Sequence, residues 1–243
     1  MAEQTKKSFL EKAAESQVWK SIFRGGGVPR NRRQRMMSVL NSVFLHLHPV
    51  RLPKHAVKLK FTWCMGGLSF FIFLILTISG ILLMFYYRPT IEYAYTDIID
   101  LAEQVPFGIM RELHRWGAHA MVISVWLHMF RVFMTGSYKP PREFNWGVGV
   151  LLMTITMFLS FTGYLLPWDS LGYAAGSIGL EMATSIPAMG PLMAQIVFGG
   201  TQLTGDTITR MYWLHIFVLP LVGTILIIIH MALVWIQGEG EPH

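Results

Sequence analysis

The sequence has few residues that could form disulfides or carry charge. Its 243 residues include one cysteine, Cys64, so no internal disulfide can form. Only 14% of the residues are charged, whereas an average soluble domain has about 25%. The first 60 residues contain no apolar segment with a cleavage site, so we expect no signal peptide. The charge deficit argues against a soluble protein and predicts a surface that largely faces lipid.

Long apolar runs are present instead. A bilayer takes about 20 apolar residues to cross, and four runs approach or exceed that length. Residues 167–209 are rich in glycine and proline, which predicts short surface helices rather than a fifth span. The sequence therefore predicts an all-α membrane protein, a bundle of four transmembrane helices at about residues 61–87, 110–135, 146–166 and 209–236.

A polar, basic arm of residues 1–60 precedes this domain of residues 61–236, and a short tail of residues 237–243 follows it. Between Met36 and His48 the apolar side chains recur at nearly helical spacing. This pattern predicts an N-terminal helix that lies flat on the membrane surface.

Lysine and arginine are distributed unevenly between the two ends of the predicted spans. Thirteen precede the first span and three lie between the second and third, whereas only four lie on the opposite side. The positive-inside rule places both termini in the cytoplasm or its equivalent, which we call the negative side. Topology thus explains the net charge of +6 without nucleic acid. Binding of lipid or a partner by the arm stays an alternative.

The second and fourth spans each contain two histidines, His114 with His128 and His215 with His230. A helix turns about 100° and rises about 1.5 Å per residue, so these spacings place each pair near one helix face, about 21–22 Å apart. Both spans cross the membrane in the same direction. Their histidines can therefore pair at two levels, His114 with His215 towards the positive side and His128 with His230 towards the negative side.

Two facing imidazoles in an apolar bundle suit haem iron, which accepts a histidine on each axial face. Such an iron has no open position, which favours electron transfer over ligand chemistry. Zinc fits less well because it needs four close ligands. The spacing therefore predicts two bis-histidine haems between the helices.

Glycines in the other two spans repeat the same spacing. Gly66 and Gly80 are fourteen residues apart, as are Gly149 and Gly163. Because these spans run antiparallel to the histidine spans, Gly80 and Gly163 fall at the His114 level, and Gly66 and Gly149 at the other. Glycine would let a flat group approach the backbone. Ordinary packing of small residues between helices is the alternative.

Two arginines lie one turn outward of the histidines of the second span. Arg111 lies three residues before His114, and Arg131 three residues after His128. They are candidates for binding haem propionates. Arginines that reach the lipid headgroups would have the same spacing, so both interpretations stay open.

Several motifs together resemble cytochrome b of quinol-oxidising complexes. They are Arg111-Glu-Leu-His-Arg-Trp116, Leu127-His-Met-Phe-Arg131, Gly163-Tyr-Leu-Leu-Pro-Trp-Asp169, and Arg210 with His215 and His230. The resemblance covers about residues 50–237. The fourteen residues between the last two histidines, the segment Phe85-Tyr-Tyr-Arg-Pro-Thr90 and the presence of only four spans are similar to cytochrome b6, the split form.

The resemblance implies one subunit of a quinol oxidoreductase that contributes to proton translocation. Quinol would be oxidised on the positive side with a Rieske iron–sulfur protein, and two b haems would carry electrons to a quinone site on the negative side. Part of the oxidation pocket would be formed by Gly163, Tyr164, Pro167, Trp168 and Asp169.

The resemblance also implies partner chains. The family's Pro-Glu-Trp-Tyr pocket motif does not occur in this sequence, so a three-helix subunit resembling subunit IV would supply it. A cytochrome c, a c-type subunit or a plastocyanin-like protein would accept electrons, and the complex would be a homodimer. The long basic arm departs from the chloroplast pattern. We therefore expect a bacterial cytoplasmic membrane rather than a thylakoid, with menaquinone as the quinol.

Cys64 lies in Trp63-Cys-Met-Gly-Gly67, which resembles the b6 segment where one cysteine holds an additional haem by a single thioether. The resemblance thus implies a covalently bound haem c. By composition alone, a buried cysteine that acts as a small apolar side chain is the favoured interpretation.

Two other functions compete with this one. A di-haem membrane anchor of a dehydrogenase or hydrogenase would need the same histidines, but it predicts no Pro-Trp-Asp pocket after the third span. A transporter or scaffold would use the histidines for packing, and it predicts no haem spectrum.

Overall fold

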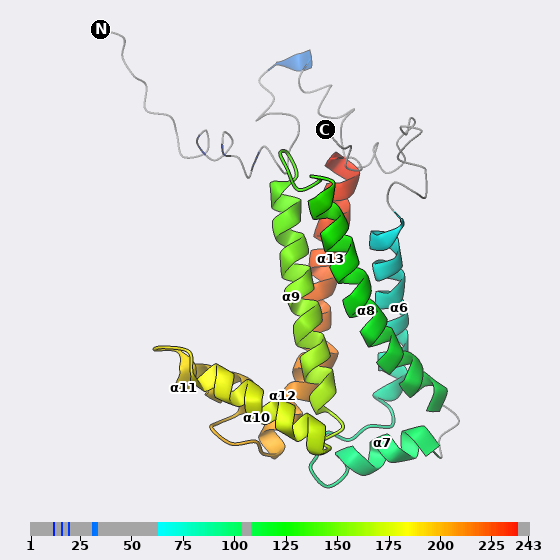
Figure 1. Cartoon of the computed structure of the whole chain (residues 1–243), viewed down its shortest axis with the longest axis vertical. Helices are drawn as coiled ribbons and strands as arrows, with labels where there is room; N and C mark the ends of the chain where they lie inside the picture. Colours follow the sequence, from blue (N-terminus) through cyan, green and yellow to red (C-terminus); the bar gives the residue numbers. More distant parts are fainter. Residues whose placement is uncertain are drawn as a thin grey trace. The chain divides into compact units, whose positions relative to one another are not determined.

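The computed structural model describes residues 63–103 and 108–237, with residues 12, 16, 19 and 31–33. In the two long ranges the regular elements are all helices (Figure 1). The surface helix predicted between Met36 and His48 lies outside the described residues. So does most of the predicted tail, residues 238–243.

Four helical segments of the described residues are long and apolar enough to cross a membrane. They are α6 (Met65–Leu83), α8 (Gly108–Met134), α9 (Glu143–Leu165) and the segment Gly205–Trp235. The last of these comprises α12 (Gly205–Trp213), the π-helical turn η2 (Leu214–Val218) and α13 (Leu219–Gln237). The prediction of an all-α protein with four membrane-spanning helices is confirmed.

The helix ends differ from the sequence-based bounds by one to four residues, and local hydrogen bonds account for the largest shifts. The fourth span begins at Gly205 because Thr204 and Thr207 form a capping box, each side chain binding the other's backbone N–H. The first span ends at Leu83 because a turn through Met84 leads into Arg88-Pro89, and proline disfavours a helical residue before it.

The chain divides into two compact units, which are described separately. Among the described helical residues, unit 1 contains residues 127–152 and 225–237. Unit 2 contains residues 65–126 and 153–224. Helices α8, α9 and α13 contribute residues to both units.

Unit 2 also contains four short elements: α7 (Ala94–Glu103), α10 (Ser170–Thr184), α11 (Gly190–Met193) and the π-helical turn η1 (Ala194–Phe198). Figure 1 shows α7 and α10 running at an angle to the long helices. Helix α7 is a difference from the sequence analysis, which expected only a polar connection there. Its one buried face, Ala94, Asp97 and Leu101, is too short to stand out in the sequence.

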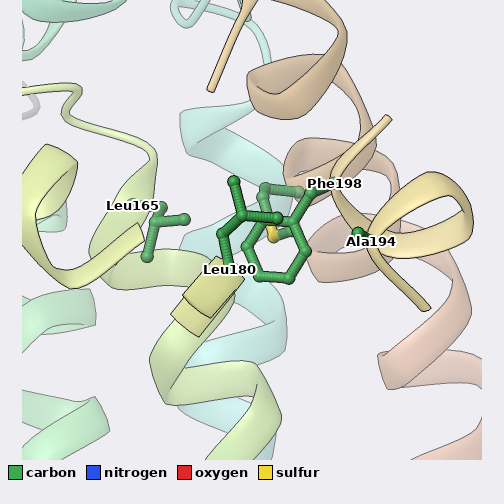
Figure 2. Close-up of a cluster of buried hydrophobic side chains, with 5 residues drawn as sticks. Leu165, Leu180, Ala194 and Phe198 are labelled. Atoms are coloured by element: carbon green, nitrogen blue, oxygen red, sulfur yellow. The ribbon is translucent and has the colours of Figure 1, made fainter. Parts of the chain in front are cut away.

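The core of unit 2 joins the end of α9 to these short elements. Apolar side chains from α9, α10, η1 and α12 pack together in it (Figure 2), namely Leu165, Leu180, Ala194, Phe198 and Met211. A second cluster holds Tyr87, Ala94 and Ile208. These contacts place the segment between α9 and α10 firmly against α12.

An ion pair holds the connection after α6 against α7. The carboxylate of Asp97 accepts hydrogen bonds from the Arg88 amide at 2.8 Å, from its Nε at 3.1 Å and from its Nη2 at 2.6 Å. The Arg88 guanidinium also lies 3.8 Å from the ring centroid of Tyr93. These bonds to the Arg88 guanidinium hold the pKa of the Asp97 carboxyl below its ordinary value.

We predict that Asp97→Asn loosens this connection, because the amide lacks the charge that three Arg88 donors share. Hydrogen–deuterium exchange at neutral pH should be faster at the Arg88 amide, while Glu103→Gln, an exposed change on the same helix, should have no effect. Because the folded pKa of Asp97 is lowered, its contribution is present above its unfolded pKa of about 3.9 and is lost as the pH falls through the folded value. Equal exchange in Asp97→Asn and the parent at neutral pH would contradict the prediction.

Candidate functional site

Two of the four span histidines face each other in unit 2. His114 lies on α8 and His215 lies in the π-helical turn η2. Their ring centroids are 6.1 Å apart and their planes are inclined by 72°. A π-helical turn holds more residues than an α-helical turn and often marks a functional position. The π-helical turn η2 contains His215, which was predicted from the sequence to bind a haem.

Both rings of this pair are held at Nδ1. Nδ1 of His114 lies 2.9 Å from Oγ of Ser79 on α6. Nδ1 of His215 lies 3.1 Å from Oγ1 of Thr162 and 3.1 Å from the carbonyl oxygen of Leu159, both on α9. Each ring is therefore anchored through one nitrogen, and Nε2 is the nitrogen left for a ligand.

Glycines allow the neighbouring helices to approach these rings. A Cβ built on Gly80 would lie 3.2 Å from Cε1 of His114, and one built on Gly163 only 2.6 Å from Cε1 of His215. The second distance is shorter than real Cβ contacts allow. Both glycines thus leave room for the imidazole rings themselves, and their predicted role in packing a haem stays a prediction.

The other two histidines face each other in unit 1. His128 on α8 and His230 on α13 have ring centroids 6.4 Å apart, with planes inclined by 83°. A Cβ built on Gly149 would lie 3.7 Å from Cε1 of His230, an ordinary contact. Nδ1 of His230 is buried and has no side-chain hydrogen-bond partner in the part of the chain that the structure describes, while the backbone of Asn145 interacts with the ring. Gly66 is exposed in the first turn of α6, in unit 2.

The distances within the two pairs test which group could lie between the rings. An imidazole nitrogen lies about 2 Å from a metal that it ligates, with its ring centre about 1 Å further back. Two imidazoles on opposite faces of one iron thus have centroids about 6 Å apart, close to the separations of both pairs. A direct edge-to-face contact would have a similar distance. The anchored Nδ1 atoms and the glycines favour ligation.

Other metal sites are not supported. Within residues 63–103 and 108–237, no group of three or more His, Cys, Asp or Glu side chains could hold a metal ion. Structural zinc needs four such ligands. Two separate histidine pairs fit haem, because its porphyrin supplies the remaining ligands of the iron.

The two predicted propionate arginines lie near the ends of α8. Nη1 of Arg111 forms a 2.6 Å ion pair with Glu112, which also lies 3.6 Å from Arg115. Arg131 lies in the last turn of the same helix. Both cations thus lie on the helix that carries His114 and His128. Their role in binding haem propionates stays a prediction.

The predicted pocket segment, Gly163 to Asp169, connects α9 to α10. The Asp169 carboxylate caps α10 by accepting a 2.7 Å hydrogen bond from the amide of Gly172. Trp168 has φ +53° and its ring packs edge-on against Tyr173, with the centroids 5.8 Å apart. Tyr164 is exposed, whereas Leu165 is fully buried. Local contacts therefore hold Trp168 and Asp169 in place, and Tyr164 is the most accessible large side chain of the segment.

Tyr87 braces the same segment. Its hydroxyl donates a 2.6 Å hydrogen bond to the carbonyl oxygen of Leu166. Burial, with smaller contributions from Tyr212 and Asp97, raises the pKa of the Tyr87 phenol, so the hydroxyl keeps its proton and stays a donor. This bond ties the chain after α6 to the turn after α9.

Cys64 lies immediately before α6 and is exposed. Both Trp63 and Cys64 have positive φ, +51° and +50°, so the chain turns sharply before the helix begins. The thiol is thus accessible for covalent attachment of a group.

Two polar residues of the site, Ser79 and Thr162, were not predicted from the sequence. Each directly precedes a glycine that was predicted to lie at the site, Gly80 and Gly163. A hydroxyl residue beside a haem-level glycine would have been the signal. A buried serine or threonine in a span usually bonds to its own helix, which hides such a role.

Known proteins are similar to most of this chain. A family model described as Cytochrome b/b6/petB matches residues 51–238. The cytochrome b6 of Heliomicrobium gestii is 40% identical over 196 residues, which cover 80% of this chain and 90% of that protein.

Two longer proteins are also similar. The cytochrome bc complex cytochrome b subunit of Chlorobaculum thiosulfatiphilum is 37% identical over 210 residues, covering 86% of this chain and 48% of that protein. A solved chain of a hyperthermophilic respiratory Complex III matches with a TM-score of 0.65 and 28% identity, covering 86% of this chain and 54% of that one. This chain spans about half the length of each.

Proposed function

The chain belongs to the cytochrome b/b6 family, and from that premise we propose that it carries electrons from quinol across a membrane as the b6-type subunit of a cytochrome bc or b6f-like complex. The observation that carries this proposal is the pair of facing imidazoles in each unit, with centroids 6.1 and 6.4 Å apart. A non-redox scaffold would have no need for this geometry twice.

We assign one haem b to each pair, His114 with His215 and His128 with His230. A haem iron with two histidine ligands exchanges one electron and leaves no position for substrate. The chain's own contribution is to present Nε2 of each imidazole, to fix the rings through Nδ1 in unit 2, and to surround both pairs with apolar helices that exclude water. Arg111 and Arg131 are the cations proposed for the propionates.

Quinol oxidation is proposed for the positive side, beside the segment of Gly163, Tyr164, Pro167, Trp168 and Asp169. Asp169 is committed to capping α10, so its proposed part is to hold the segment in shape. Tyr164 is half exposed at the end of α9 and is the residue we expect quinol to contact. A partner must complete the pocket.

The proposed partners are a three-helix subunit that supplies the rest of the longer cytochrome b, a Rieske protein, and a cytochrome c, c-type subunit or plastocyanin-like acceptor. The coverage supports the first, because this chain spans only 48% of the Chlorobaculum protein. We also propose a homodimer of complexes in a bacterial cytoplasmic membrane, with both termini on the cytoplasmic side.

Affinity purification of the complex through a tag on this chain tests the assembly. We expect it to bring down a Rieske protein, a three-helix subunit and a c-type cytochrome, and to show reduction of a cytochrome c by a quinol. Recovery of a peripheral dehydrogenase or hydrogenase instead would replace this proposal with the di-haem anchor.

The additional haem proposed at Cys64 gives a separate prediction. The thiol is exposed beside the start of α6, and haem chemistry needs no second cysteine for a single thioether. In a denaturing gel the parent chain should stain for haem, and Cys64→Ala should lose all of the stain. As a control, His114→Ala should keep it, because that site holds its haem without a covalent bond. An unstained parent band would reject the thioether.

A further inference from the structure

The two histidine pairs differ in what holds their Nδ1 atoms. In unit 2 each ring contacts a hydroxyl, His114 through Ser79 at 2.9 Å and His215 through Thr162 at 3.1 Å. In unit 1, His230 interacts with the backbone of Asn145, and no side-chain hydroxyl of the described residues bonds its Nδ1. The difference suggests that the hydroxyls have a role beyond filling space.

The surroundings of Thr162 determine the direction of its hydrogen bond to His215. A hydroxyl has one proton, and Thr162 Oγ1 directs it at the carbonyl oxygen of Phe158 at 2.8 Å or of Leu159 at 3.1 Å. Its oxygen can then only accept. The Leu159 carbonyl oxygen, 3.1 Å from Nδ1, also only accepts. Nδ1 of His215 therefore carries the proton.

Ser79 acts on His114 in the same way. Its hydroxyl donates to the carbonyl oxygen of Ile75 at 2.7 Å or of Leu76 at 3.2 Å. The backbone of Leu76 also bonds the His114 ring, and because a carbonyl oxygen can only accept, Nδ1 of His114 donates and the remaining lone pairs of Ser79 Oγ can accept from it. A neutral imidazole has one N–H, so a proton on Nδ1 leaves Nε2 with a free lone pair.

We propose that Ser79 and Thr162 are positioning residues that reinforce the Nδ1–H tautomer, which backbone carbonyls already favour, and fix the rotation of His114 and His215. An acceptor on Nδ1–H raises the basicity of the ligating nitrogen, which stabilises the oxidised iron. The hydroxyls thereby lower the reduction potential of the haem at this pair. This inference rests on the proposed function, since it requires a haem there.

The local sequence supports a joint role for each hydroxyl residue and the glycine that follows it. Each hydroxyl residue directly precedes the glycine that contacts the same ring, Ser79 before Gly80 and Thr162 before Gly163. The glycine admits the imidazole and the hydroxyl fixes it. At Gly149, which contacts His230, the preceding residue is the apolar Val148.

The competing interpretation is structural. Serine and threonine inside helices often bond to the carbonyl four residues back, and both hydroxyls do so here. In that case their contact with the rings would be incidental. Removing a hydroxyl would then leave the potential unchanged, whereas the proposal requires it to rise.

Redox titration of the b-type α band in the purified complex tests the proposal with Ser79→Ala and Thr162→Val. We expect each to favour reduction of one haem component by up to about tenfold, the lower end of second-sphere effects, which is about 59 mV for one electron. The second component should not move. Ser79→Thr and Thr162→Ser keep the hydroxyl and should restore the parent potential.

Ser124→Ala is the matched control. Ser124 lies on α8 with His114 and its hydroxyl is buried, but its side-chain partner is Ser69 at 3.0 Å. It should leave both potentials unchanged. Unchanged potentials in Ser79→Ala and Thr162→Val, or equal shifts of both components, would overturn the proposal.

Loss of the haem is interpreted through the rescue variants. Loss in Ser79→Ala with retention in Ser79→Thr supports the proposal, and loss in both overturns it. Failure of the proposed function is a different result, because the parent protein itself would then show no b-type α band.

Discussion

Replacing His215 with alanine should remove one of two b haems and leave the other. The two ligand pairs belong to separate compact units, so each haem is held by its own histidines. An iron that loses one axial histidine also loses half of its protein ligands. The b-type absorbance of His215→Ala should therefore fall by about half, and His230→Ala should remove the other half.

The chain offers a close control in His119. It lies on α8 like His114 and His128, but its ring is exposed and Nδ1 contacts the carbonyl oxygen of Arg115 at 2.8 Å. His119→Ala should keep both haems, measured as pyridine haemochrome per chain. If His215→Ala kept both, or if one substitution in each unit removed the same haem, the pairing would be wrong.

Adding a side chain at Gly163 should have the second large effect. A Cβ there would lie 2.6 Å from Cε1 of His215, so the ring or helix α9 must move. Overpacking of this kind costs about 1–3 kcal/mol, against about 0.5–1 kcal/mol gained by replacing a helical glycine with alanine. We expect Gly163→Ala to weaken haem retention and Gly163→Val to abolish it at this pair.

The other glycines provide a graded series. The Cβ distance to the nearest histidine atom is 3.2 Å at Gly80 and 3.7 Å at Gly149, while Gly147 on α9 has nothing within 4 Å. Haem loss on substitution with alanine should therefore be larger at Gly80 than at Gly149. The variant Gly147→Ala should keep its full haem content. Equal occupancy across the series would show that the glycines serve general helix packing.

Helical periodicity was sufficient to predict the histidine pairs. Ionisable residues are rare in spans, and a regular helix turns by a known angle, so spacing alone places His114 and His128 on one face. The same reasoning selected four glycines. A Cβ built on Gly80, Gly163 or Gly149 would lie within 4 Å of a histidine of the expected pair, whereas Gly66 belongs to unit 2 and its role stays a prediction.

Features that depend on tertiary contacts could not be predicted in this way. The π-helical turn that contains His215 has no signal in the sequence pattern and is seen only in the structure. Asp169 was selected as a pocket residue, yet its carboxylate caps α10, because a family motif does not separate chemistry from shape. Ser79 and Thr162 were missed because a hydroxyl's partner is known only once the neighbouring helix is in place.

The reduced-minus-oxidised spectrum of the purified protein, recorded during a redox titration, tests the central claim most directly. Two bis-histidine haems predict a b-type α band that titrates as two one-electron components of equal amplitude. A protein without a b-type α band would contradict the account, since the four histidines would then serve packing alone.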